Sequence, residues 1–376
     1  MNIKNKKLLI ATIITALTLT VAIVVIFWDN KEEEEEQDTE IISDPYEYFL
    51  LISSLDNLPD ITEPDGIVFD TSITRIPCYL FFSGDENDLG DLFNKLYRKE
   101  ETDAFIRGNI TDVVGENITS VGHGAFAHNR ITNIVLPKVT AIGVGAFVNN
   151  RLTSIDLPKV DTLHSTAFMN NKITSIELPE VITICSAAFI NNQITSIDLP
   201  KAITIRHGAF TFNELIRINL PLVEFIGETA FAFNRLTSIS LPNVTTIGIY
   251  SFNNNQLYRI ELPKVTTVGY GAFLNNQLTV IDLPNVTTIG EGAFSGNRLI
   301  RLHLPVVTTI KRGAFALNRD LASIHIYINP DMLTIGEHIF HDHSGAPITI
   351  YIKNAAWKEK MERKFSAYSN VVVKVI

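Results

Sequence analysis

The sequence has few cysteines and no excess of basic residues. Only Cys78 and Cys185 occur among its 376 residues. Two cysteines do not make a disulfide framework, and both lie among apolar neighbours, so we expect both to be buried. The chain has 31 Lys and Arg against 41 Asp and Glu, a net charge of −10. This balance argues against nucleic acid as a partner, because phosphate binding needs a basic surface.

The sequence also lacks the patterns that carry catalysis or hold cofactors. No nucleophile–base pairing, phosphate-binding loop or zinc motif stands out. The densest group of possible metal ligands is His338, His341, Asp342 and His343. Its spacing fits no strong metal template, and a solvated turn explains it equally well. We therefore expect no enzyme activity, no bound metal and no cofactor.

In place of such motifs, one 21-residue unit repeats along the middle of the chain. Phenylalanine keeps this step from Phe126 to Phe315, proline over 137–305 and asparagine over 129–318. A fixed period of this length around Leu-x-x-Ile-x-Leu is the signature of a leucine-rich-repeat solenoid. We therefore predict a β-rich, right-handed superhelix of stacked 21-residue coils.

The pattern within one unit predicts the local structure of a coil. Leu-x-x-Ile-x-Leu ends in an apolar–polar alternation, which favours a short strand with one buried face. Proline ends this strand because it has no N–H to donate. A second β-prone piece such as Val244–Ile247 follows, and Ala-Phe with a polar turn completes the coil. One coil is too small to bury its own apolar side chains, so stability depends on its neighbours.

Two invariant columns give more specific expectations. We expect the phenylalanines to form a buried spine of stacked rings. For the asparagines, one interpretation is a ladder of hydrogen bonds to backbone groups of adjacent coils. The other is a solvated turn residue that tolerates unusual backbone angles. We favour the ladder, because the asparagine stays the same over 129–318 while its neighbours vary.

The consensus of these repeats resembles that of a known family. The unit Leu-Thr-Ser-Ile-x-Leu-Pro-x-Val-Thr-Thr-Ile-Gly-x-Gly-Ala-Phe-x-x-Asn looks like the repeat of BspA-like leucine-rich-repeat proteins, found mainly on bacterial surfaces and in some parasitic protists. The resemblance covers residues 105–345. It departs from the family in that the repeats are shorter than usual and asparagine stands where many members carry cysteine. The resemblance implies a binding or adhesion role and supplies no catalytic residue.

The N-terminal residues 1–28 have the features of a membrane anchor. Three lysines precede an uncharged run from Leu8 to Trp28. As a helix, this run of 21 residues spans about 31 Å, the thickness of a bilayer core. Because the basic side stays in the cytoplasm, the rest of the chain is expected outside. A cleaved signal peptide is the alternative, but no Ala-x-Ala site follows the run. We expect an uncleaved, single-pass signal-anchor.

The segment between the anchor and the array divides into two parts. Residues 29–45 contain the unbroken acidic run Glu32–Glu36, which we expect to be a solvated linker. Residues 46–104 do not repeat, and we expect a non-repeating module that caps the first coil. Within it, Gly66–Phe69 and Ile76–Phe82 are expected as strands.

The C-terminal residues 346–376 also depart from the repeat. Ile348–Ile352 is expected as a strand, Ala355–Phe365 as a helix and Val371–Ile376 as a final strand. We expect them to cap the end of the array at 105–345, because an uncovered last coil would expose its apolar interior.

The positions on either side of the strand isoleucine form the candidate binding surface. Their side chains are expected to point outward, onto a concave face. Carboxylates on adjacent coils would stand about 5 Å apart and repel each other. Such a column attracts a basic protein or a divalent ion, although solubility of an exposed sheet is an equally open explanation. The residues of this surface are Asp156, Glu177, Asp198, Arg217, Arg259, Glu261, Asp282, Arg301, His303 and His325.

These features predict a membrane-anchored cell-surface protein that binds other proteins or mediates adhesion through its solenoid. Two other functional classes stay open. One is a structural envelope protein without a soluble ligand, and the other is an enzyme with its site in 46–104. Because the surface ends in histidines, any binding through that end is expected to change near pH 6.5.

Overall fold

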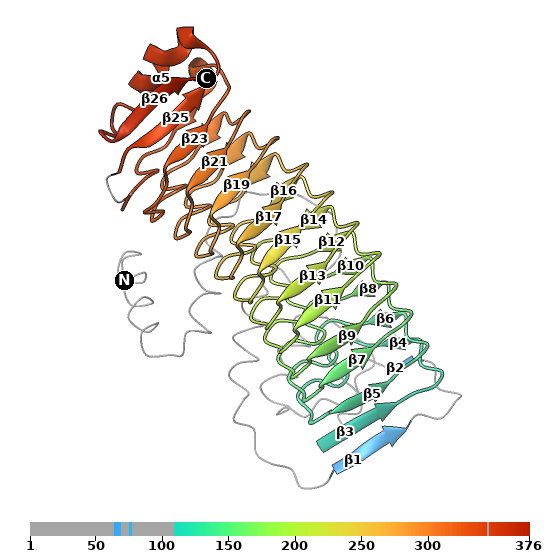
Figure 1. Ribbon diagram of the computed structural model, residues 1–376. Helices are drawn as coiled ribbons and strands as arrows, with labels where there is room; N and C mark the ends of the chain where they lie inside the picture. The colour runs from blue at the N-terminus through green and yellow to red at the C-terminus, as the bar shows by residue number, and fades with distance from the viewer. Residues whose placement is uncertain (1–63, 69–74, 77–108, 344–345) are drawn as a thin grey trace, which may run out of the picture. The chain divides into compact units, whose positions relative to one another are not determined.

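The computed structural model describes residues 64–68, 75–76, 109–343 and 346–376, which all belong to one compact unit (Figure 1). The expected anchor at 1–28, the acidic linker at 29–45 and most of the module at 46–104 lie outside these residues, as does Cys78. Cys185 is buried, as expected.

The repeats form a leucine-rich-repeat solenoid whose coils each contribute two short strands (Figure 1). The first strand is the x-Ile-x centre of the repeat, and its neighbours in adjacent coils run parallel to it. These strands are β5 (Asn133–Val135), β7 (Ser154–Asp156), β9 (Ser175–Glu177), β11 (Ser196–Asp198), β13 (Arg217–Asn219), β15 (Ser238–Ser240), β17 (Arg259–Glu261), β19 (Val280–Asp282), β21 (Arg301–His303) and β23 (Ser323–His325).

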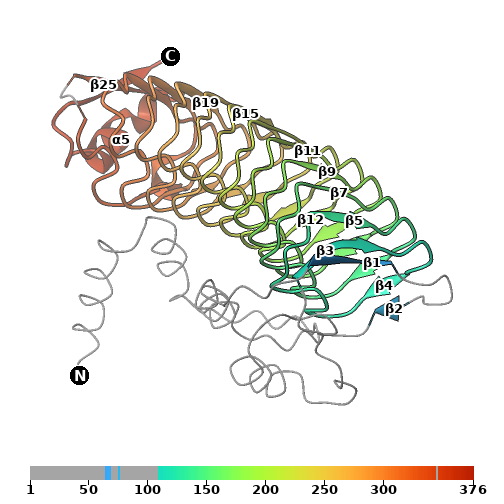
Figure 2. The ribbon, with the colours of Figure 1, turned by 90° about the horizontal axis from the view of Figure 1, so that it is seen from below.

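The second strand of each coil belongs to one continuous parallel sheet of 12 strands. Figure 2 shows the coils one behind another, with the strands along their walls. The strands of this sheet, in spatial order, are β2 (Arg75–Ile76), β4 (Ser120–Val121), β6 (Ala141–Ile142), β8 (Thr162–Leu163), β10 (Thr183–Ile184), β12 (Thr204–Ile205), β14 (Phe225–Ile226), β16 (Thr246–Ile247), β18 (Thr267–Val268), β20 (Thr288–Ile289), β22 (Thr309–Ile310) and β24 (Thr334–Ile335).

The sheets extend upstream of residue 105, where the array was expected to begin. β1 (Pro64–Val68) pairs in parallel with β3 (Asn109–Val114), which in turn pairs with β5. β2 pairs in parallel with β4. Both strands lie in the segment expected to be non-repeating, so part of that segment continues the two rows of strands without sharing the repeat consensus.

The C-terminal segment follows the predicted order of elements. β25 (Ile348–Ile352) pairs with β23 and with β26 (Val371–Val375), and a 3₁₀ turn, η3 (Ala355–Trp357), leads into α5 (Lys358–Lys364). A second 3₁₀ turn, η2 (Pro330–Met332), lengthens the last coil before β24. Met361, Phe365 and Val373 join the apolar core, so this segment packs against the array.

The predicted phenylalanine spine is confirmed. The ten side chains from Phe126 to Phe315 are at most 1% exposed. Neighbouring rings are stacked, with centroids 5.2 to 5.9 Å apart along the column. This offset stacking is a favoured geometry for aromatic pairs.

The asparagine ladder is confirmed as well, and Asn213 shows its geometry. Its Oδ1 accepts a hydrogen bond from the N–H of Ile194 in the preceding coil at 3.1 Å. Its Nδ2 donates to the carbonyl of Phe189 in that coil at 2.8 Å and to that of Phe210 in its own coil at 3.2 Å. The side chain is 6% exposed, so the solvated-turn interpretation is wrong. The residue before each of these asparagines takes the unusual backbone angles instead, as with Phe212 at φ 56°.

His128, which stands directly before the ladder asparagine Asn129, gives a pH-dependent prediction. Burial lowers the pKa of His128 to about 4, against an ordinary value of about 6.5 in the unfolded chain. The unfolded state therefore takes up the proton first, and stability is full above pH 6.5 and falls as the pH drops from 6.5 towards 4. The side chain is partly exposed, so we expect this one group to account for about 1–2 kcal/mol.

The control is His128→Asn, because Asn149 occupies the same position of the next coil with nearly the same φ, 54° against 57°. Melting temperatures of both proteins are compared at pH 7.5 and pH 4.5. The variant should lose less stability on acidification than the unchanged protein. Equal losses would show that the ring of His128 is not held neutral by the fold.

Candidate functional site

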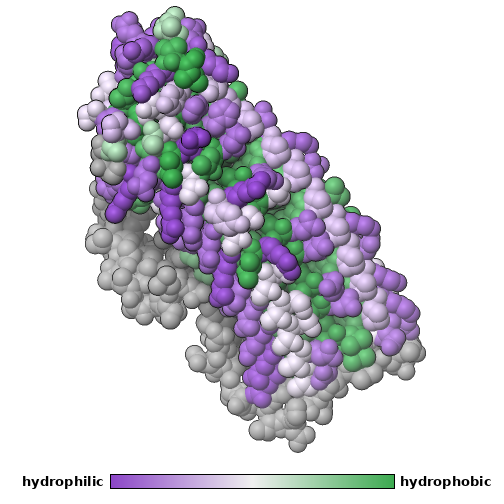
Figure 3. Space-filling view, viewed as in Figure 1, coloured by the Kyte–Doolittle hydropathy of each residue, from purple (hydrophilic) through white to green (hydrophobic). Residues whose placement is uncertain are grey.

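The strand face consists of the residues on either side of the central apolar residue in strands β5 to β23. In β7, Ile155 is buried and its two neighbours, Ser154 and Asp156, are exposed. Most of the other strands repeat this alternation, so the outward orientation predicted for these side chains is confirmed. In Figure 3, hydrophilic and apolar side chains lie in rows that run from coil to coil.

At its N-terminal end the strand face carries adjacent carboxylates. Asp156 is the direct register partner of Glu177 in the neighbouring strand. Within the described part of the chain neither carboxylate has an ion-pair partner. Asp198 differs, because its Oδ1 accepts a hydrogen bond from the Asn219 amide at 2.9 Å.

Towards its C-terminal end the strand face pairs its charges internally. Arg259 forms an ion pair with Glu261 in its own strand. Hydrogen bonds from Ser240 and Arg259 lower the pKa of the Glu261 carboxyl. His303 Nδ1 lies 2.6 Å from Asp282 Oδ1 across neighbouring coils. Arg217 and Arg301 are exposed on the same face.

The strand face ends in an aromatic cluster that the sequence analysis did not identify. His325 stacks on Tyr351 of β25 with ring centroids 4.7 Å apart. The Lys353 ammonium lies 4.2 Å from the centre of the Tyr327 ring. Burial, followed by the charges of His303 and Arg301, lowers the pKa of His325. Protonation of His325 is therefore expected at a lower pH than that of an unperturbed histidine.

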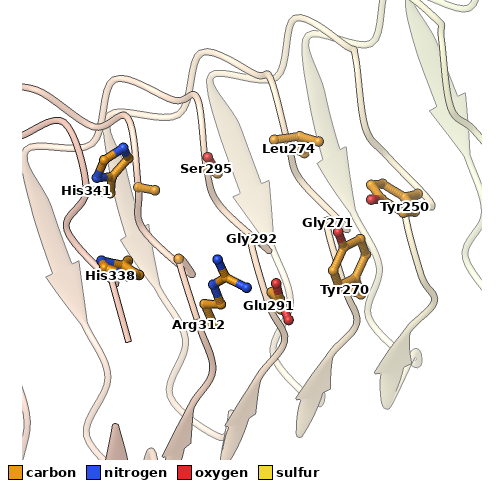
Figure 4. A pocket seen from close by; sticks show the side chains of 12 residues that line it. Tyr250, Tyr270, Gly271, Leu274, Glu291, Gly292, Ser295, Arg312, His338 and His341 are labelled. Carbon is orange, nitrogen blue, oxygen red and sulfur yellow. The ribbon is translucent and has the colours of Figure 1, made fainter. Parts of the chain in front are cut away.

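A second surface feature lies on the turns that carry the phenylalanines, just after the second strand of each coil. A groove of about 520 Å³ runs over the turns of several coils (Figure 4). Its floor is made by Gly271, Gly292 and Gly313, which stand two residues before three successive spine phenylalanines. Glycine is also the consensus residue at this repeat position, and what distinguishes the groove is a run of three glycines between Tyr250 and His338.

Neither a metal site nor a membrane span is found among the described residues. They contain no group of three or more His, Cys, Asp or Glu side chains placed to hold a metal ion, and residues 338–343 are among them. No helix among them is long and apolar enough to cross a bilayer. The run from Leu8 to Trp28 lies outside the described residues.

Three solved structures resemble this fold at low sequence identity. The pneumococcal vaccine antigen PcpA is 16% identical, with 81% of this chain and 85% of that chain covered and a TM-score of 0.46. A leucine-rich-repeat protein from Bacteroides ovatus is 17% identical, with 83% and 94% covered and a TM-score of 0.46. One from Eubacterium ventriosum is 21% identical, with 65% and 74% covered and a TM-score of 0.42. No curated protein sequence matches the chain.

The family assignment comes from the repeats themselves. The model of the BspA-type leucine-rich-repeat region matches residues 119–235 and 224–346, with 6 copies of the repeat. These matches span more than half of the sequence and coincide with the coils that carry the phenylalanine spine and the asparagine ladder. The chain therefore belongs to the BspA-type leucine-rich-repeat family.

Proposed function

We propose that this protein is a membrane-anchored surface protein that binds a basic protein ligand through its strand face. The observation that carries the proposal is the register pairing of Asp156 with Glu177. Two adjacent carboxylates without a counter-charge in the described part of the chain destabilise the folded array. A cationic partner relieves that repulsion on binding, so the arrangement favours a ligand over a purely structural role.

The remaining charges of the strand face limit binding of a basic ligand to the N-terminal half of this face. Glu261 already has the cationic partner Arg259, and Asp282 is already in contact with His303. Arg217 and Arg259 follow the acidic column and add positive charge. A basic ligand is therefore attracted to the coils of β7, β9 and β11 and repelled further along the same face.

The test of this function is the combined replacement of Asp156, Glu177 and Asp198 by serine. Binding of a lysine-rich peptide and of a glutamate-rich peptide of equal length is measured by surface plasmon resonance at low and moderate salt. We expect the unchanged protein to bind only the lysine-rich peptide, more weakly at higher salt. The triple variant should lose about tenfold in affinity, since three exposed charge contacts contribute about 0.5 kcal/mol each.

A matched control separates the strand face from the overall charge. Asp161, Glu224 and Asp320 are exposed carboxylates elsewhere on the coils, and their replacement by serine changes the net charge equally. This control should keep the peptide affinity. Equal losses of peptide affinity in both variants would show that the effect comes from the net charge of the protein and not from the strand face. Unchanged peptide binding in the triple variant would exclude the acidic column as the site. The same conclusion would follow if calcium raised the melting temperature of the triple variant as much as that of the unchanged protein.

The membrane anchor belongs to the same proposal. The uncharged run Leu8–Trp28 behind three lysines supports a single-pass anchor with the array outside the cytoplasm. Carbonate washing of membranes from cells that express the full chain tests it. The full-length protein should stay in the membrane pellet, and its release in intact form would contradict the anchor.

A further inference from the structure

The groove on the turns is bounded at both ends by larger side chains at its floor position. Gly271, Gly292 and Gly313 are preceded at this position by Tyr250 and followed by His338. The Tyr250 ring leans over Gly271, whereas nothing lies within 4 Å of the place where a Cβ on Gly292 would stand. Because the Tyr250 ring covers the first of the three glycines, the open trough extends over three coil-to-coil steps of about 4.8 Å, or about 14 Å.

The backbone N–H groups of the groove floor are not available to a peptide strand, and its carbonyls already accept one hydrogen bond each. The N–H groups of Gly271, Gly292 and Gly313 donate to carbonyls of the following coil at 2.9 to 3.0 Å. The carbonyls of the same glycines accept bonds within their own turns at 2.9 to 3.0 Å. A peptide that adds to a sheet edge needs free backbone groups of this kind, so recognition in this groove depends on side chains.

The walls of the groove supply aromatic surface at one end. Further along they supply a hydrogen-bond acceptor and a hydrogen-bond donor. Figure 4 shows Tyr270, Glu291, Arg312 and His338 along one side. The Tyr250 and Tyr270 rings meet edge to face with centroids 4.8 Å apart, and the Tyr270 side chain is 42% exposed. Within the described residues, neither Glu291 nor Arg312 has an ion-pair partner, so both keep their hydrogen-bonding capacity for a ligand.

We infer that this groove binds a short oligosaccharide chain. Sugar rings present apolar C–H faces that pack on tyrosine, and their neighbouring hydroxyl groups both donate and accept hydrogen bonds. The carboxylate of Glu291 accepts such bonds and the Arg312 guanidinium donates them, one coil apart. An elongated trough of this length holds several linked rings, and its volume lies in the range of small-molecule sites. The site is separate from the strand face, and its ligand class differs from that of the proposed function.

The experiment is calorimetric titration of the full chain with four probes: maltotriose, cellotriose, the N-acetylglucosamine trimer and the tripeptide Gly-Tyr-Gly. We expect at least one trisaccharide to bind and the tripeptide not to bind. Gly292→Tyr fills the floor with the residue found at Tyr250, whose φ of 51° is close to the 59° of Gly292. This variant should abolish saccharide binding. Tyr270→Ser and Arg312→Ser, which copy Ser165 and Ser186 at the same repeat position, should each weaken it at least fivefold.

The control for strain is Gly208→Tyr, which makes the same change at a φ of 61° on a coil outside the groove. It should lower the melting temperature at least as much as Gly292→Tyr, because Ile190 Cδ1 lies 3.3 Å from the place where a Cβ on Gly208 would stand, and it should leave saccharide binding unchanged. The strand-face triple variant should also bind the saccharide normally, so failure of one proposal is distinguishable from failure of the other. Absence of binding to all three trisaccharides, binding of the tripeptide alone, or saccharide binding that survives Gly292→Tyr would each overturn the inference.

Discussion

Replacing Phe210 by alanine is expected to lower the free energy of unfolding by about 3–5 kcal/mol. Its ring is fully buried and stacks on Phe189 and Phe231 at 5.2 and 5.6 Å. The truncation leaves a cavity between two coils and removes both stacking contacts. Because a solenoid's stability is the sum of its coils and of the interfaces between neighbours, the loss affects two interfaces at once. Thermal and urea unfolding, followed by circular dichroism, measure it.

Phe212 provides the matched control for this substitution. It lies two residues away in the same coil, is half-buried and stacks on Phe233 at 4.8 Å. Phe212→Asn installs the commonest residue at this position of the coils, so we expect a loss of about 1 kcal/mol or less. Equal losses at the two positions would mean that the buried spine contributes no more than surface stacking.

Replacing Asn213 by alanine is expected to cost about 2–4 kcal/mol, the second large effect. The N–H of Ile194 is buried, and the Asn213 side chain is its partner at 3.1 Å. Without it the N–H is left unsatisfied, which costs about 1–3 kcal/mol. The carbonyl of Phe189 loses its shorter bond from Asn213 but keeps the one from Asn192 at 3.2 Å. The loss of packing against adjacent coils adds to these terms.

Asn191→Gly is the control for the ladder. Asn191 is exposed, has a φ of 55° and donates only to the neighbouring Asn170 side chain at 3.0 Å. Glycine accepts this backbone conformation without strain, so the change is expected to cost less than about 1 kcal/mol. Hydrogen exchange of the Ile194 amide gives an independent reading. It should accelerate in Asn213→Ala and stay slow in Asn191→Gly, and slow exchange in both would contradict the ladder's energetic role.

The sequence by itself determined the coil. The 21-residue step places every spine phenylalanine and every ladder asparagine at one point of the turn, and the apolar–polar alternation sets the inward and outward faces of each short strand. These inferences succeed because each depends on identical neighbours one period apart. Apolar–polar alternation also predicted the strand at Ile348–Ile352 in the C-terminal segment, although this segment does not repeat.

Only the tertiary structure decided which side chains of different types contact each other on neighbouring coils. Asp198 and Asp282 belong to the acidic column in the sequence, yet Asn219 and His303 in the next coils engage them. β1 and β2 joined the two rows of strands without carrying the repeat consensus, because backbone pairing needs extended conformation and register rather than particular side chains. The groove depends on three glycines between Tyr250 and His338, and only the stacking of the coils brings residues so far apart in sequence to one trough.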